Sequence, residues 1–73
     1  MKFIKVESSN LEKIGYDIDK KVLAVQFDSG RVYNYSNVPQ EVVLNLLFAE
    51  SIGKYFNANI REKYTFEEVK ENE

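Results

Sequence analysis

Two short patterns in this sequence resemble catalytic or metal-binding motifs. Ser51 and Lys54 fit the S-x-x-K spacing in which a lysine activates a nucleophilic serine, but the other motifs of such enzymes do not occur in the chain. Asp17 and Asp19 have the spacing of early calcium ligands in an EF-hand loop, but the glycine and glutamate that such a loop needs further on do not follow. We therefore interpret Ser51 as a helix cap and the aspartates as part of a solvated turn.

A row of hydrogen-bond donors is a stronger candidate for a binding site. Lys54, Asn57 and Arg61 recur at intervals of three and four residues, which places them on one face of a predicted helix. Such a stripe suits phosphates or carboxylates. The alternative interpretation is an ordinary solvated helix face.

A second candidate lies on a predicted strand. Arg31, Tyr33 and Tyr35 alternate along the chain and therefore share one strand face. Two tyrosine rings beside an arginine can form a stacking platform for single-stranded nucleic acid. The alternative is that the rings pack beneath helices, with their hydroxyls at the edge of the core.

Composition limits the chemistry available to the chain. It has 73 residues, enough for one domain, and contains neither histidine nor cysteine. Disulfides are therefore excluded, and so are the commonest metal ligand and the commonest general base at neutral pH. We expect a non-enzymatic protein without metal or cofactor. The absence of cysteine favours a cytoplasmic protein. Because no apolar run is long enough for a membrane span or a signal-peptide core, we also expect a protein that does not bind membranes.

The net charge of −2 is unevenly distributed. Residues 67–73 hold four acids and one base, whereas residues 1–66 hold nine bases and eight acids. We therefore predict one domain over residues 1–66 and an acidic tail over 67–73. The body lacks the clear basic excess that is typical of strong nucleic-acid binders.

Four segments alternate in the manner of strands: 3–7, 11–17, 22–27 and 31–36. The register of the last two depends on the loop between them. If Asp28, Ser29 and Gly30 all form the loop, Val25 faces Tyr33 and both tyrosines join the aliphatic face. If only Ser29 and Gly30 form it, every pair slips by one residue and polar side chains must build the core. We favour the three-residue loop.

Two helices should follow these strands. The first begins near Pro39 and runs to about Glu50, and it is apolar around most of its circumference. Leu44 and Phe48 lie farthest from its main buried face, so they are covered by the second helix or form an exposed interface, such as that of a homodimer. Ser51 caps the second helix. The stretch 65–68 has the sequence of a capping box and predicts a further helical turn.

These elements predict an α+β fold, with a three- or four-stranded antiparallel β-meander and two C-terminal helices packed on one face. The helices should lie on the side of the sheet that carries Leu23, Val25 and Phe27.

The order of the motifs resembles a known family. I-G-Y-D, the Y-x-Y at 33–35, V-P before a helix and G-K-Y-F-N-x-x-I-R at 53–61 are similar to the KTSC domain, over roughly residues 8–66. This domain is named for the C-terminal extension of some bacterial lysyl-tRNA synthetases, and it also occurs as a small stand-alone protein in bacteria and phages. The family's motif positions in this chain are Tyr33, Tyr35, Gly53, Tyr55, Phe56, Asn57, Ile60 and Arg61. The resemblance implies a small α+β domain without known enzymatic activity, for which RNA binding has been suggested.

Together these observations favour a non-catalytic binding module, either RNA-binding or associated with a synthetase. The rival hypothesis is a protein–protein interaction module: an accessory protein of a bacterium or phage, or a homodimer formed through the first helix.

Overall fold

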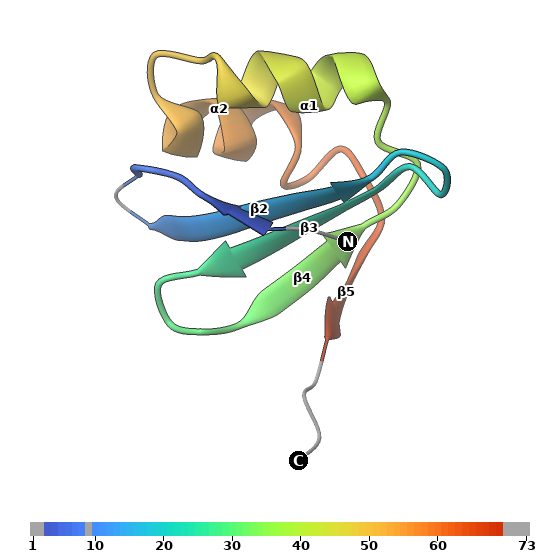
Figure 1. The fold of residues 1–73 in the computed structure, drawn as a ribbon, viewed down its shortest axis with the longest axis horizontal. Helices are drawn as coiled ribbons and strands as arrows, with labels where there is room; N and C mark the ends of the chain where they lie inside the picture. Colours follow the sequence, from blue (N-terminus) through green and yellow to red (C-terminus); the bar gives the residue numbers. More distant parts are fainter. Residues whose placement is uncertain (1–2, 9, 70–73) are drawn as a thin grey trace.

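Five antiparallel strands form a single sheet in the order β1–β2–β3–β4–β5, and both helices lie on one face of it (Figure 1). The computed structural model describes residues 3–8 and 10–69. Its elements are β1 (Phe3–Lys5), β2 (Leu11–Asp17), β3 (Val22–Phe27), β4 (Val32–Tyr35), α1 (Gln40–Leu47), α2 (Ile52–Asn59) and β5 (Phe66–Val69). The predicted α+β class, antiparallel sheet and pair of helices on one face are confirmed.

The β3–β4 hairpin has the three-residue loop that we favoured. Val25 pairs with Tyr33 and Leu23 with Tyr35. Phe27 N–H donates to the carbonyl of Arg31 at 2.9 Å, and Gly30 has a φ of +96°, which glycine adopts without steric cost. Both tyrosines therefore lie on the same face as the aliphatic row.

The turn between β2 and β3 is stabilised by Asp17. Its Oδ1 accepts hydrogen bonds from the backbone N–H groups of Asp19 and Lys20, each at 3.1 Å. Asx geometry of this kind explains the two closely spaced aspartates without a metal ion.

The helices begin as their sequences predict. Pro39 directly precedes α1, and Ser51 Oγ accepts a hydrogen bond from Lys54 N–H at 3.3 Å at the start of α2. Helix α1 ends at Leu47, earlier than the expected Glu50, because the chain leaves helical geometry at Phe48 to reach the extended Ser51 cap.

The core lies between the sheet and the helices. Tyr16 fixes the segment that enters α1, because its hydroxyl donates to the carbonyl of Val38 at 2.6 Å. The buried side chains come from β2, β3, β4, both helices and their flanking residues: Leu11, Ile14, Leu23, Val25, Tyr35, Val38, Val43, Leu46, Phe56 and Ile60.

The prediction of a helical turn at residues 65–68 is wrong. Phe66–Val69 forms β5 and pairs with β4, with Tyr35 opposite Phe66 and Tyr33 opposite Glu68. Without β5, β4 would present a free edge of unpaired N–H and C=O groups, and pairing satisfies them. The sheet therefore has five strands, not three or four.

The boundary of the domain moves with this correction. Residues 67–69, expected in an acidic tail, belong to β5, so the folded part extends at least to Val69. The rest of the expected tail, 70–73, lies outside the described residues.

Candidate functional site

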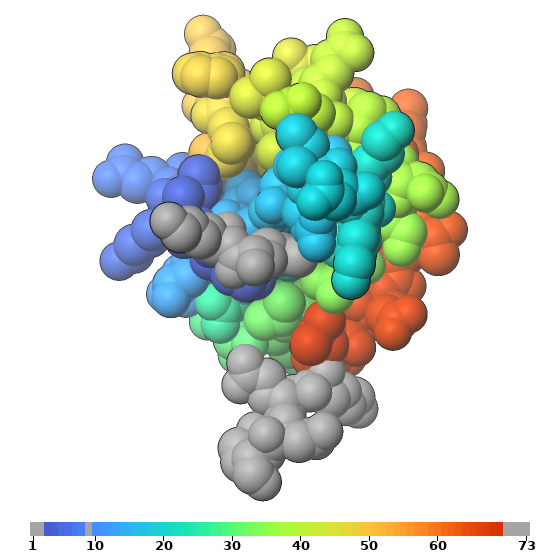
Figure 2. Space-filling model, turned by 45° about the vertical axis from the view of Figure 1, so that its right-hand side comes forward, coloured from blue at the N-terminus to red at the C-terminus, as the bar shows by residue number. Residues whose placement is uncertain are grey.

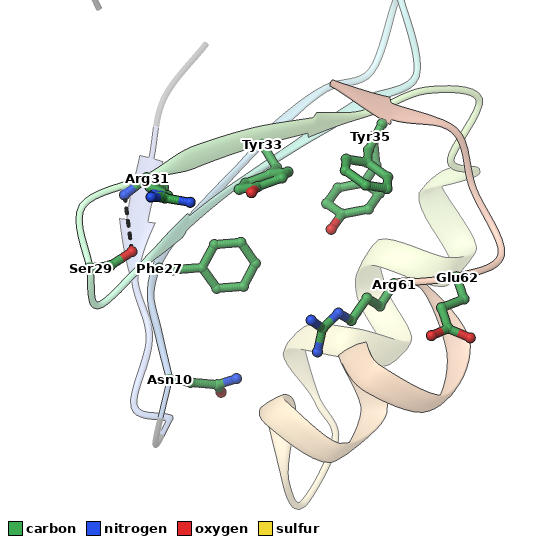
Figure 3. Close-up of a pocket in the computed structure, with 9 residues that line it drawn as sticks. Asn10, Phe27, Ser29, Arg31, Tyr33, Tyr35, Arg61 and Glu62 are labelled. Carbon is green, nitrogen blue, oxygen red and sulfur yellow. Dashed lines mark hydrogen bonds between the residues drawn. The ribbon is translucent and has the colours of Figure 1, made fainter. Parts of the chain in front are cut away.

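An open pocket of about 480 Å³ lies between the β3–β4 hairpin, β5 and the segment that follows α2 (Figure 3). It opens on the helix-bearing side of the sheet, where the helices leave the end of the hairpin uncovered. The residues that line it are Asn10, Phe27, Ser29, Arg31, Tyr33, Tyr35, Arg61, Glu62 and Phe66.

Four aromatic rings line the pocket, and together with the buried ring of Phe56 they form a closed cycle of contacts. Phe27 contacts Tyr33 with ring centroids 5.4 Å apart, and Tyr33 contacts Phe66 at 5.4 Å. Phe66 contacts Tyr35 at 5.3 Å, Tyr35 contacts Phe56 at 5.4 Å, and Phe56 returns to Phe27 at 5.7 Å. Edge-to-face and tilted geometries at these separations are favourable, so the five rings, here called the aromatic cycle, support one another.

The aromatic cycle is buried at one end and open at the other. Phe56 is fully buried and Tyr35 is 2% exposed, whereas Phe66 is 48% exposed. Tyr33 and Phe27 are half-buried. The buried rings fix the positions of the open ones, which leaves preorganised ring faces available to a planar ligand.

Two arginines border the open rings from different parts of the chain. Arg31 directly precedes β4, and Arg61 follows α2. Both side chains are exposed. Figure 3 shows them on opposite sides of the pocket. Glu62 is the one acidic residue in the lining, so the lining carries an excess of one positive charge.

The end of α2 determines where Arg61 lies. The helix stops at Asn59, and the N–H groups of Ile60 and Arg61 both donate to the carbonyl of Phe56 at 2.9 Å. This wide closing turn directs Arg61 away from the helical stripe and toward the pocket (Figure 3).

The predicted binding residues therefore divide into two groups. Arg31, Tyr33, Tyr35 and Arg61 are brought together in the pocket. Lys54 and Asn57 remain exposed on α2 and do not line it. The expected stripe assumed a helix that continued through Arg61, and α2 ends two residues earlier.

The sequence analysis did not identify five of the nine lining residues: Asn10, Phe27, Ser29, Glu62 and Phe66. The strand alternation predicts the correct sheet face for Phe27 but no site there. The capping-box pattern predicts a helical turn at Phe66. Tyr64 and Phe66 are two residues apart, the spacing at which side chains share one face of a strand. This spacing is the signal in the sequence that favours β5. Asn10 lies beside the hairpin because its backbone carbonyl accepts a hydrogen bond from the N–H of Asp28 at 3.0 Å. This bond ties the start of β2 to the hairpin loop.

Burial changes the acidity of Tyr35. Desolvation raises the pKa of its phenol above the ordinary value of 10.0; the positive charge of Arg61 opposes this shift and Tyr33 adds to it. The influence of Arg61 reflects its closeness to the hydroxyl, which points into the pocket (Figure 3).

A separate apolar surface occurs on α1. Leu44 is 47% exposed and Phe48 is 84% exposed, so α2 does not cover the two residues expected as surplus. In Figure 2 the yellow-green side chains of α1 lie along the outer surface of the molecule, away from β5.

No group of three or more histidine, cysteine, aspartate or glutamate side chains suited to a metal ion occurs among residues 3–8 and 10–69. In the same part of the chain, neither helix has the length and apolar character needed to cross a membrane.

The fold and the site define the class of this protein: a small α+β domain with an aromatic pocket between the β3–β4 hairpin and β5. The sequence model of the KTSC domain matches residues 7–64, and the chain belongs to this family. The crystal structure of a KTSC domain protein from Yersinia pestis superimposes with a TM-score of 0.89 at 33% identity, covering 94% of this chain and 97% of that one. The predicted resemblance is thus confirmed.

Relatives of two kinds share this sequence. An uncharacterized protein of Stutzerimonas stutzeri (strain A1501) is 47% identical over 57 residues, which are 78% of this chain and 80% of that protein. A lysine–tRNA ligase of Nostoc punctiforme is 38% identical over 66 residues, which are 90% of this chain but only 12% of the ligase. The domain therefore resembles both a small separate protein and a minor part of a synthetase.

The raised pKa of Tyr35 predicts a loss of stability in alkali. Below the ordinary pKa the phenol is protonated in both the folded and the unfolded chain, so stability is fully present. Above about pH 10 the unfolded chain ionises first, and stability is lost as the pH rises through the folded pKa. Tyr35→Phe, which keeps the ring, should therefore lose less free energy of unfolding than the parent between about pH 8 and about pH 11. Urea unfolding at both pH values measures this, and equal losses in the two proteins would contradict it.

Proposed function

We propose that this KTSC domain is a non-catalytic module that binds single-stranded RNA in its aromatic pocket. The observation that carries the proposal is the open end of the aromatic cycle, bordered by Arg31 and Arg61. Bases of any kind stack on exposed aromatic rings with roughly 1–3 kcal/mol each, and neighbouring arginines supply contacts to phosphates.

The geometry favours a single strand over a duplex. In a duplex the base faces are stacked on one another, so rings such as Tyr33 and Phe66 have nothing flat to contact. An unstacked base in a single strand can enter an open pocket beside them. With Arg31 available for a phosphate and Arg61 for a second polar group of the ligand, binding should be moderate in strength and salt-dependent.

The synthetase relatives support RNA as the ligand class. Lysine–tRNA ligases of Nostoc punctiforme and Trichormus variabilis each contain a region that matches 90% of this chain. Because these relatives are named for tRNA, we take RNA as the ligand class for the domain. On this proposal the chain works in the cytoplasm, as its cysteine-free sequence led us to expect.

Binding alone, without catalysis, accounts for the groups in the pocket. Ser29 supplies the aliphatic hydroxyl of the lining, and its Oγ accepts from Arg31 N–H at 3.5 Å. The lining residues include no histidine that could activate this hydroxyl as a nucleophile. The remaining side chains, apart from the carboxylate of Glu62, are suited to stacking and to donating hydrogen bonds.

The arginines should control RNA affinity and its dependence on salt. Fluorescence anisotropy with a labelled, unstructured RNA at low salt should show binding by the parent. Arg31→Ala and Arg61→Ala should each weaken it and flatten the slope of log affinity against log salt by about 0.7, the value for one phosphate of a single strand. Lys20→Ala, which removes an exposed charge from the β2–β3 turn, serves as the control and should change neither by as much.

Lys54→Ala tests the other half of the predicted stripe in the same assay. A small effect is expected, because Lys54 lies outside the pocket. A larger effect than that of Arg61→Ala would move the site to α2. Absence of RNA binding by the parent at low salt would overturn the proposed function.

Exposed apolar side chains on α1 favour a second candidate function, a protein–protein interface. Leu44 and Phe48 are both exposed, and the N–H of Phe48, just after α1, donates to the carbonyl of Leu44 at 3.0 Å, so the two side chains lie one turn apart and form one patch. Two copies of the chain could bury this patch symmetrically, because the same surface would meet itself around a two-fold axis. This interface would leave the pocket free.

Leu44→Glu should distinguish a dimer from a monomer. Because Leu44 is about half exposed, the variant should fold, and it should sediment as a monomer where the parent sediments as a dimer. Asn45→Glu places the same charge on a neighbouring exposed position and should leave the dimer intact. A parent that is monomeric at high concentration in sedimentation velocity excludes the homodimer.

A further inference from the structure

The hydroxyl of Tyr35 is the least explained polar group near the pocket. The side chain is 2% exposed, and its ring is held by contacts with Phe56 and Phe66. Buried tyrosines normally give their hydroxyl a hydrogen-bond partner. Tyr16 does so through the carbonyl of Val38, whereas the hydrogen bonds between described residues include none from Tyr35.

This hydroxyl points into the pocket, where a ligand can meet it (Figure 3). No fully buried side-chain oxygen or nitrogen among the described residues lacks a partner, so the unpaired hydroxyl of Tyr35 must reach the open space of the pocket. The buried ring fixes the position of the oxygen, and a group held in this way is preorganised for recognition.

Arg61 makes this end of the pocket rich in donors. Figure 3 shows its guanidinium reaching toward the aromatic rings and the carboxylate of Glu62 set back from them. A guanidinium donates through a planar fork and cannot accept, while a phenol can do either. A ligand edge with two adjacent acceptors therefore matches this pair of side chains best.

We propose that Tyr35 and Arg61 recognise the acceptor edge of one unstacked base, so that the pocket prefers guanine to adenine. This inference rests on the proposed RNA-binding function and assigns specificity to that site. The two purines stack almost equally on Tyr33 and Phe66, so the difference between them arises at their polar edges.

Guanine presents O6 and N7 side by side as acceptors, which is the pattern that arginine recognises bidentately. Adenine presents an amino group in place of O6, so Arg61 could donate only to N7 and would lose one of its two hydrogen bonds. The Tyr35 hydroxyl can donate to a guanine acceptor and so complete the contact.

Two cytidine heptamers, one with a central guanosine and one with a central adenosine, test the inference by fluorescence anisotropy. The parent should bind the guanosine heptamer more tightly. Tyr35→Phe should lower the ratio of the two affinities by about threefold to tenfold, the size of one hydrogen bond, and should leave binding of the adenosine heptamer nearly unchanged. Tyr55→Phe removes a hydroxyl from a half-buried tyrosine outside the pocket and should keep the parent ratio.

Arg61→Gln provides a second variant at an exposed position and should also lower the ratio, because its amide cannot reproduce the bidentate fork. Thermal unfolding of each variant confirms that it is folded. If the parent binds both heptamers equally, or if Tyr35→Phe keeps the parent ratio, the inference is overturned while RNA binding stands. If neither heptamer binds, the proposed function fails and the inference fails with it.

Discussion

The pairing of β5 with β4 is the constraint on which the rest of the structure depends. It places Phe66 opposite Tyr35 and thereby closes the aromatic cycle. The same pairing draws the chain back from the end of α2 to the sheet, so that Arg61 lies at the border of the pocket. Without β5 the hairpin would keep its own register, but the tyrosine rings would lack their outer wall.

The hairpin and the second helix could be predicted from the sequence because local physics determines both. Gly30 allows the positive φ of the loop, and the alternation of apolar residues selects one register over the other. Ser51 is a good N-cap wherever the rest of the chain lies. These features depend on residues close to one another in sequence.

β5 and the complete pocket could not be predicted in the same way. The stretch around Phe66 fits the sequence pattern of a capping box, which predicts a helix. Its extended conformation results from pairing with the edge of β4, more than thirty residues earlier in the chain. The position of Arg61 depends on where α2 ends, and the double donation to the Phe56 carbonyl is not visible in residue types. The sequence predicts the four candidate residues from two separate patterns: Arg31, Tyr33 and Tyr35 on a strand, and Arg61 on a helix. Only the fold brings them into one pocket.

Nuclear Overhauser effects between the protein and a bound single-stranded RNA test the central claim most directly. We expect contacts between base protons and the ring protons of Tyr33 and Phe66, because these are the open members of the aromatic cycle. Contacts confined to the Lys54 and Asn57 side chains of α2, with none to the rings, would contradict a stacking pocket and return the site to the helix face.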